Sequence, residues 1–442
     1  MKKLFVFGIC LFFFLTPSIY PTSTSKLNYS KNQENEQLKE WTLIFYCSGD
    51  DKEMFGDCED CILNNETLLL LQNIYMKMPI FSKLKINIVV LIDGASVIHG
   101  YYSPSKLPFI NKFNLIEEYN EDNFANYTKL RDFLIKCKND FPAKRYLFYG
   151  FGHGGGWSGA FSDEYTNDPE KPYDLMEMQE IRYAIEASGG MDIIIFGNCI
   201  MGCIESAYEL RNCTDVYIGS QEITIQPLLP LTSWYNCINV LKKNPYLSTY
   251  DTADEIIKNF KKIYRNPCPT IKENTILSSS RPKVFTMSAI KTKNINNLSL
   301  AIDKLSEIYI KNQSKYEPYF TNARAKTEDF PSQLLSSKHI NGFLVDIYNF
   351  TDILSEEAQI NNDYILYNAS EEVKNCLKNT IISEWHQKNH PNANGLNLFL
   401  SEGNISENPG PLAKYDHKSY VNATLEFKDD HLWDEFLEIF LN

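Results

Sequence analysis

The sequence predicts an α/β fold, in which a mostly parallel central sheet lies between layers of helices and a smaller C-terminal subdomain packs on it. Short, nearly continuous apolar runs alternate with amphipathic helical stretches, which is typical of strands buried on both faces of a parallel sheet. The runs end at turn residues such as Gly, Ser or Asp. With 442 residues, 43% of them hydrophobic, the chain can build a large core.

The first half of the chain alternates strands with helices. Because crossovers between parallel strands are right-handed, the helices should cover both faces of the sheet. Functional residues are then expected at the carboxyl ends of the strands. The expected strands are 41–46, 85–93, 145–150, 192–196 and 216–220, and the expected helices are 62–78, 127–138 and 175–188.

In the second half the order of expected helices and strands differs from that in the first half, and the change begins near Pro227, Pro230 and Pro245. We therefore place a boundary near residue 230, between a main α/β region, 41–230, and a C-terminal α/β subdomain, 231–442. The elements expected in the subdomain are helices at 252–264, 294–311, 347–359, 364–386 and 432–441, and strands at 283–289, 342–346 and 395–400.

The N-terminus predicts a secretory signal peptide, residues 1–20. Lys2 and Lys3 precede an apolar run, 4–15, which is too short to span a bilayer comfortably. An uncleaved anchor is the alternative. Residues 21–40 form a polar linker. We expect a protein without a stable membrane span, secreted or in the lumen of the secretory or lysosomal pathway.

The glycosylation sequons and the cysteines also concern the expected location in the secretory pathway. Asn-x-Ser/Thr sequons suit a glycosylated product. In an oxidising compartment most cysteines of the mature chain are expected to form disulfides. Cys58 and Cys61 form a lone CxxC pair, which supports a zinc site only weakly. The sequons are at Asn28, Asn65, Asn126, Asn212, Asn297, Asn312, Asn349, Asn368, Asn404 and Asn422, and the other cysteines are Cys10, Cys47, Cys137, Cys199, Cys203, Cys213, Cys237, Cys268 and Cys376.

The charge of the chain excludes some partners. Its formal net charge is −13, and no basic cluster interrupts the sequence. Nucleic acid and anionic membranes are therefore not expected to bind it. We expect a monomer that needs no partner other than its substrate.

Two motifs carry the candidate chemistry. Residues 152–157, GHGGGW, follow the strand at 145–150, and residues 197–202, GNCIMG, follow the strand at 192–196. If the two strands are neighbours, the imidazole of His153 and the thiol of Cys199 meet at one edge of the sheet. A cysteine nucleophile needs this arrangement with its base.

The residues around this pair have expected roles. His153 would take the proton of Cys199 and later protonate the departing amine. The N–H groups of Gly154 and Cys199 would form the oxyanion hole. A helix expected directly after Cys199 would lower the thiol pKa. Cys203 and Cys213 are rival nucleophiles, and each motif taken alone also fits a structural role, as a polar turn or a buried, inert cysteine.

With these motifs the chain resembles the clostripain family of cysteine peptidases, whose fold is the caspase-like α-β-α sandwich. The resemblance implies that 41–230 is the catalytic region and that His153 and Cys199 form a dyad. It also implies that the chemistry needs no cofactor, with calcium an accessory in several members. The resemblance spans about 41–441, in the family order of the segments 41–50, 153–157, 198–202, 219–222, 287–290, 345–348 and 395–399.

One position departs from the family pattern. Members that cleave after Arg or Lys carry an Asp two residues before the nucleophile, where this chain has Gly197. A buried cationic side chain without a counter-charge is unfavourable, so the strict Arg/Lys preference is not expected here. Ser220 and Glu222, on the loop after the strand at 216–220, are further candidate substrate-binding residues, and Glu222 would supply a charge from another direction.

The sequence thus predicts a secreted cysteine endopeptidase that hydrolyses peptide bonds in a peptide or protein substrate through a thioester on Cys199. Two alternatives stay open. The missing acid at Gly197 also fits a catalytically silent binding protein that keeps the fold. A peptide ligase would use the same residues.

Overall fold

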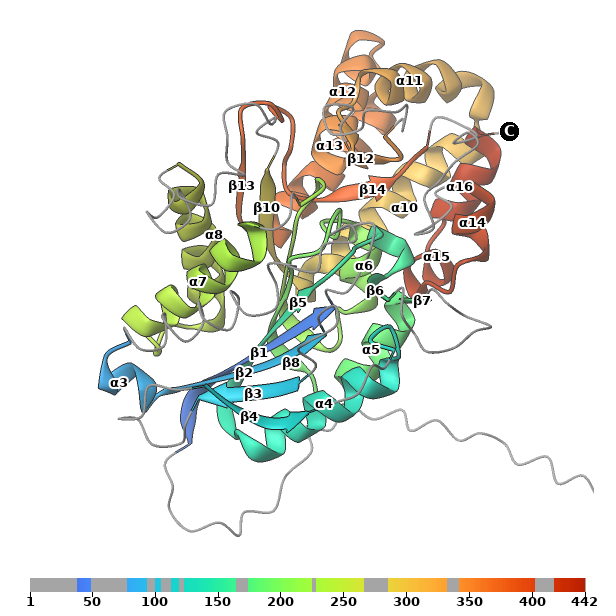
Figure 1. The fold of residues 1–442 in the computed structure, drawn as a ribbon. Helices are drawn as coiled ribbons and strands as arrows, with labels where there is room; N and C mark the ends of the chain where they lie inside the picture. The colour runs from blue at the N-terminus through green and yellow to red at the C-terminus, as the bar shows by residue number, and fades with distance from the viewer. Residues whose placement is uncertain are drawn as a thin grey trace, which may run out of the picture. The chain divides into compact units, whose positions relative to one another are not determined.

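A nine-stranded sheet forms the centre of the protein (Figure 1). We use a computed structural model, which describes residues 38–48, 78–93, 100–104, 113–118, 123–163, 174–224, 228–265, 285–331, 342–401 and 417–441. The expected signal peptide, most of the polar linker and nearly all of the helix at 62–78 lie outside the described residues.

The five central strands of this sheet are parallel, in the order β9-β8-β5-β1-β2. Antiparallel strands extend the sheet at both edges, with β10 and β13 beside β9, and β3 and β4 beside β2. The bounds are β1 Lys39–Ser48, β2 Ile86–Asp93, β3 Gly100–Pro104, β4 Phe113–Glu118, β5 Ala143–Phe151, β8 Met191–Phe196, β9 Thr214–Gly219, β10 Thr286–Lys291 and β13 Ile381–His386.

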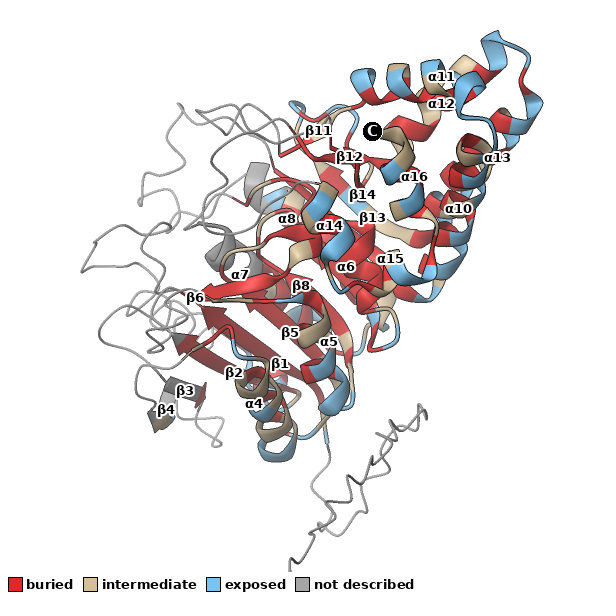
Figure 2. Cartoon of the chain, turned by 90° about the vertical axis from the view of Figure 1, so that its right-hand side faces the viewer, coloured by how far each residue is buried: buried red, intermediate tan, exposed pale blue. Residues whose placement is uncertain are grey.

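Helices cover both faces of the sheet, as the right-handed crossovers predict. Side chains of α4, α5, α6 and α10 belong to one buried core, and side chains of α7 and α8 belong to a second core on the other face. The strands between these layers are buried (Figure 2). The bounds are α3 Ile80–Lys83, α4 Tyr127–Asp140, α5 Met178–Ala187, α6 Ile204–Glu209, α7 Leu228–Lys243 and α8 Thr249–Arg265.

The C-terminal half adds a three-stranded sheet, in the order β11-β12-β14, and further helices. Its buried aromatic side chains, Trp433 and Phe436 among them, continue the first core. The bounds are β11 Asp329–Phe330, β12 Leu344–Asp346, β14 Asn397–Phe399, α10 Ile295–Lys311, α11 Gln313–Lys326, α12 Ile347–Ile360, α13 Tyr364–Thr380, α14 His417–Asn422, α15 Glu426–Asp430 and α16 Trp433–Phe440.

The predicted fold class is confirmed, and the differences are local. The helix expected at 364–386 ends at Thr380, and Ile381–His386 forms β13, because its β-branched and aromatic residues pair with β10. The helix expected from 175 begins at Met178, after the short strand β7, Asp174–Met176, which pairs with β6, Ala160–Asp163. The edge strands β3 and β4 and the helices α7 and α11 were not expected.

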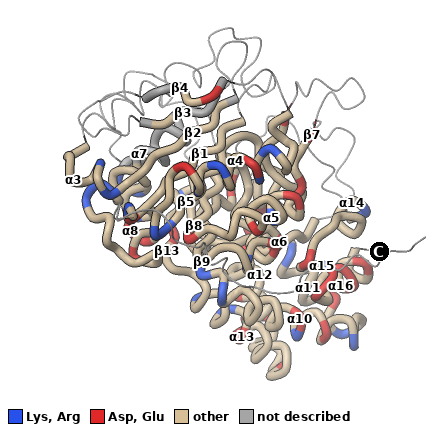
Figure 3. The backbone as a smooth tube through the Cα atoms, turned by 90° about the horizontal axis from the view of Figure 1, so that it is seen from below, with Lys and Arg blue, Asp and Glu red and all other residues tan. Residues whose placement is uncertain are grey.

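The charged residues of both signs are spread over the described elements. Positions of Lys and Arg are interspersed with positions of Asp and Glu along the backbone (Figure 3). Among the described helices, none has the length and hydropathy needed to cross a bilayer.

The expectation that most cysteines form disulfides is wrong for the described part of the chain. Seven cysteines there are free thiols, and five of them are buried. Three of the buried ones, Cys47, Cys137 and Cys237, lie on different elements, β1, α4 and α7, and their side chains belong to the buried cores. Burial raises the pKa of the thiols of Cys47 and Cys237, which keeps them protonated. The seven are Cys47, Cys137, Cys199, Cys203, Cys213, Cys237 and Cys376.

This arrangement predicts the thiol content. When the protein is denatured without a reductant, at least the seven described thiols per chain should react with a chromogenic disulfide reagent. The same assay on reduced protein is the control for total cysteine. A count well below seven before reduction would show that buried thiols of the described elements pair after all.

Candidate active site

The histidine motif follows the end of β5 and turns sharply at the edge of the sheet. The carbonyl of His153 accepts hydrogen bonds from the N–H of Phe161, at 3.0 Å, and from the side-chain amide of Asn198, at 2.8 Å. A short 3₁₀ helix, Gly156–Ser158, follows and buries Trp157. The indole packs edge-on against Phe399 and Tyr420 of the C-terminal half, with ring centroids 5.5 and 5.2 Å apart. Both halves of the chain therefore fix the histidine loop.

The cysteine motif follows β8 and lies directly against the histidine motif. β5 and β8 are neighbouring parallel strands, as the sequence predicts. A Cβ placed on Gly154 would lie 2.4 Å from the carbonyl oxygen and 2.8 Å from the nitrogen of Cys199. Only glycine permits so close an approach between two backbones. The structure thus brings His153, Gly154 and Cys199 together at the carboxyl edge of the sheet.

The thiol of Cys199 lies beside Thr224, a residue that the sequence did not single out. The N–H of Thr224 donates to Sγ at 3.4 Å, and the Thr224 hydroxyl lies 3.4 Å from the same sulfur. That hydroxyl also donates to the carbonyl of Gly197 at 3.0 Å. Because these partners come from the loop after β9, they could not be recognised from the spacing of the two motifs.

The expected effect of a helix N-terminus on the thiol is wrong. Residues 200–203 are not helical, and α6 begins only at Ile204. Burial instead raises the pKa of the Cys199 thiol, hydrogen bonds from Thr224 oppose the shift, and the charge of Glu222 adds to it. Without substrate, the site therefore favours a protonated thiol at neutral pH.

The N–H of Gly154 is not used by the backbone pairing of its own loop. Gly154 forms an isolated antiparallel bridge with Ala160. The two hydrogen bonds of this bridge use the N–H groups of Gly155 and Phe161. The N–H of Gly154 takes no part in them, and Gly154 is partly exposed beside the backbone of Cys199. The role of this N–H as an oxyanion donor stays a prediction.

The position of the family's acidic residue is filled by an aromatic ring. A Cβ on Gly197 would lie 2.2 Å from the hydroxyl oxygen of Tyr149 and 2.8 Å from its Cζ. Tyr149 is fully buried in β5 and packs on Phe45. An aspartate at residue 197 therefore cannot be accommodated while this ring keeps its place. Tyr149 looks like an ordinary core residue in the sequence.

The other two candidate substrate-binding residues are buried and already in contact with protein groups. The hydroxyl of Ser220 lies 2.9 Å from that of Thr286. One carboxylate oxygen of Glu222 accepts the N–H of Ile223 at 2.7 Å, and the other lies 3.3 Å from Nε2 of His390. His390, a residue that the sequence did not single out, is thus the partner of Glu222.

The rival nucleophiles are inaccessible. Cys203 and Cys213 are buried, and burial raises the pKa of both thiols. Sγ of Cys203 contacts the hydroxyl of Ser206 at 3.1 Å, and Sγ of Cys213 donates to the carbonyl of Leu210. Of the three candidates, only Cys199 is partly exposed.

The described residues give no evidence for the calcium that several family members use. No group of three or more His, Cys, Asp or Glu side chains there could hold a metal ion. We therefore assign no calcium ligands, and no step of the chemistry below uses a metal.

A histidine loop beside a cysteine loop, at the carboxyl edge of a parallel sheet between two helical layers, defines a caspase-like protein. The sequence model of the clostripain family matches residues 76–440, and the chain belongs to this family. It is 25% identical over 217 residues to clostripain from Hathewaya histolytica, a stretch that covers 42% of this chain. The chain thus spans only 38% of the length of that curated relative.

Solved structures show the same fold. An inactive zymogen C11 protease from Parabacteroides distasonis superposes with a TM-score of 0.60 at 16% identity, over 89% of this chain and 99% of that one. A secreted C11 cysteine protease from Bacteroides thetaiotaomicron, in complex with an irreversible peptide inhibitor, superposes with a TM-score of 0.62 at 15% identity. The superposition covers 90% of this chain and 100% of that one. The caspase-like α-β-α sandwich expected from the sequence is confirmed.

The contact at Gly197 predicts a double-mutant cycle. Gly197→Asp alone should lower the free energy of unfolding by about 1–3 kcal/mol, because the new side chain overlaps the ring of Tyr149. In a Tyr149→Leu background the same substitution should have a clearly smaller effect. Urea unfolding of the four proteins measures both values, and equal effects in the two backgrounds would contradict the contact.

Proposed function

We propose that this protein is a cysteine endopeptidase in which Cys199 is the nucleophile and His153 is the general base and acid. The observation that carries the proposal is the contact between the two motifs, where Gly154 lies on the backbone of Cys199 and Asn198 donates to the carbonyl of His153. Membership of the clostripain family supports it. So does the secreted cysteine protease of the same fold, which binds a peptide inhibitor.

The reaction begins with transfer of the Cys199 proton to His153. The thiolate then attacks the carbonyl carbon of the scissile peptide bond, and the N–H groups of Gly154 and Cys199 stabilise the oxyanion. As the C–N bond breaks, His153 protonates the departing amine, which leaves a thioester on Cys199. Water, deprotonated by His153, hydrolyses the thioester, releases the acid product and restores the thiol.

Thr224 lies beside the group that reacts in the first step, in which Cys199 loses its proton. In the free protein, Thr224 contacts the sulfur that must attack the substrate. Burial raises the pKa of this thiol, so His153 must take the proton during the reaction rather than before it. We infer that the dyad becomes an ion pair only when substrate is bound.

The substrate preference follows from charges near the nucleophile. A basic P1 side chain needs a buried carboxylate, and the family position has Gly197 with Tyr149 in its place. Glu222, the remaining candidate, is fully buried beside His390. We therefore propose that the enzyme prefers uncharged P1 residues, since burying a cationic side chain without a partner is unfavourable.

The proposed location is the secretory pathway. Seven of the ten sequons, all but Asn28, Asn65 and Asn404, lie in the described part of the chain. Most of the seven are exposed, such as Asn126 and Asn368. Asn349 differs, because its side-chain oxygen accepts the N–H of Glu328 at 2.9 Å. We propose that glycans are attached to exposed sequons and not to Asn349.

The nucleophile assignment predicts that Cys199→Ala and His153→Ala each abolish cleavage of a mixed peptide library. The expected loss is at least about a thousandfold in kcat/KM, because both groups take part in every step. Cys376→Ala, on α13 in the C-terminal half, is the matched control and should keep full activity. Activity retained by Cys199→Ala would contradict the assignment, and a folded but inactive wild-type protein would favour the silent binding protein.

The P1 proposal predicts a change of specificity in one double variant. Mass-spectrometric profiling of cleavage sites should find few Arg or Lys residues at P1 for the wild type. Tyr149→Leu combined with Gly197→Asp should introduce such cleavage, because the smaller side chain makes room for the acid. Tyr149→Leu alone is the control and should not introduce it. Cleavage after Arg or Lys by the wild type would show that another group provides the charge.

A further inference from the structure

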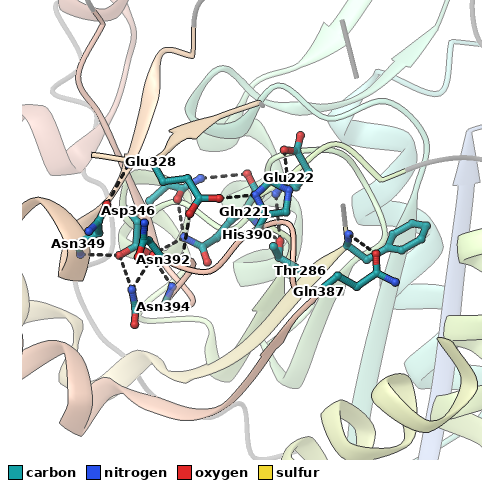
Figure 4. A network of polar contacts seen from close by, with 12 residues as sticks. Gln221, Glu222, Thr286, Glu328, Asp346, Asn349, Gln387, His390, Asn392 and Asn394 are labelled. Atoms are coloured by element: carbon teal, nitrogen blue, oxygen red, sulfur yellow. Dashed lines mark hydrogen bonds and ion pairs between the residues drawn. The ribbon is translucent and has the colours of Figure 1, made fainter. Parts of the chain in front are cut away.

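A buried polar network connects the loop after β9 to the C-terminal half of the chain (Figure 4). The side-chain amide of Gln221 donates to Asp346 at 2.8 Å, and its oxygen accepts the N–H of Gly395 at 2.7 Å. The carbonyl of Gln221 accepts from Asn397 at 3.0 Å. The loop that reaches the nucleophile is therefore fixed by residues more than 100 positions away.

His390 lies inside this network between two carboxylates. Its Nδ1 lies 2.6 Å from Glu328 and its Nε2 lies 3.3 Å from Glu222 (Figure 4). The ring is fully buried and packs against Phe330, with ring centroids 5.2 Å apart. A cation between two carboxylates removes the repulsion that they would otherwise exert on each other in a buried site.

Two short paths lead from Glu222 to the nucleophile. The carbonyl of Glu222 accepts the N–H of Ile200, the residue after Cys199, at 3.2 Å. Two residues beyond Glu222, Thr224 contacts the sulfur of Cys199. Whatever fixes Glu222 therefore fixes both the backbone after the nucleophile and the group beside its thiol.

We propose that His390, as a cation between Glu222 and Glu328, is a positioning residue for Cys199: it holds the loop 220–224 in place and compensates the charge of Glu222 near the thiol. The part of this proposal that concerns catalysis rests on the proposed peptidase function. The part that concerns the thiol does not, because the reactivity of Cys199 can be measured without a substrate.

The ionisation of His390 gives the proposal a pH signature. Burial disfavours the charged ring, but the two carboxylates outweigh burial and raise the pKa of His390 to about 9. The other nearby charged groups, His386 and its partner Glu384, lie on β13 and interact with each other at 2.9 Å. His390 is therefore a cation at neutral pH and loses its charge as the pH rises through about 9.

The test is the rate at which iodoacetamide alkylates Cys199 between pH 7 and 10, followed by peptide mass spectrometry. His390→Gln should slow alkylation about three- to tenfold at pH 7.5, because the uncompensated charge of Glu222 disfavours the thiolate. The wild-type and His390→Gln rates should converge above pH 9, where the wild-type imidazole is also uncharged. Adding Glu222→Gln should restore the rate to within about twofold of wild type.

Cys376, half-buried on α13, is the internal reference in every sample. At each pH, its alkylation rate should be the same in the wild type and in the variants. If His390 had only a structural role, the ratio of the wild-type rate to the His390→Gln rate would be the same at every pH. In addition, Glu222→Gln would not restore the rate of the His390→Gln protein. Either result would overturn the proposal. Should His390→Gln not fold, Glu222→Gln alone decides: faster alkylation than wild type supports the proposal, and an equal or slower rate overturns it.

The same proteins separate this inference from the proposed function. If Cys199 responds as expected but no peptide is cleaved, the positioning of the thiol is correct and the peptidase assignment fails. If peptides are cleaved but His390→Gln leaves the alkylation profile unchanged, the peptidase assignment is correct and His390 has no part in positioning Cys199.

Discussion

The close contact of two backbones, at Gly154 and Cys199, is the constraint on which the rest of the site depends. It brings two loops together that leave neighbouring strands, and it requires a residue without a side chain at one of them. The parallel register of β5 and β8 makes the two strands end at the same level along the strand direction, so that both loops leave the sheet side by side. The hydrogen bond from Asn198 to the carbonyl of His153 then fixes their relative position. The chemistry is thus a consequence of how the strands end.

The groups around the thiol differ from those expected for an activated cysteine. The sulfur lies next to a threonine and within the influence of a carboxylate, and the nearest helix begins too late to lower its pKa. Since burial raises its pKa, this thiol is expected to react with general electrophiles more slowly at neutral pH than an exposed cysteine does. This is consistent with the proposed peptidase, in which proton transfer to His153 accompanies the reaction with substrate. It also explains why Thr224, Glu222 and His390 have to be considered together with the dyad.

The central sheet, and the meeting of the histidine and cysteine motifs at its edge, could be predicted from the sequence, and the reasons are physical. His153 and Cys199 follow apolar runs that are buried on both faces, so the position of their side chains follows from the strand ends. Tyr149 could not be predicted as a feature of the site, because within a strand it looks like core. His390 could not be predicted either, since it lies in a loop and its partner Glu328 is 62 residues away. The boundaries of α13 and α6 depend on tertiary pairing that local sequence does not encode.

The packing of Trp157 on Phe399 and Tyr420 has a consequence for the order of events during synthesis. The partners of the histidine loop, and those of Glu222, emerge from the ribosome long after the two motifs themselves. A nascent chain that ends before residue 382 therefore has both motifs but lacks His390, Phe399 and Tyr420. The histidine loop and the loop after β9 can therefore gain all of their packing partners only after the segment that contains these residues has been made.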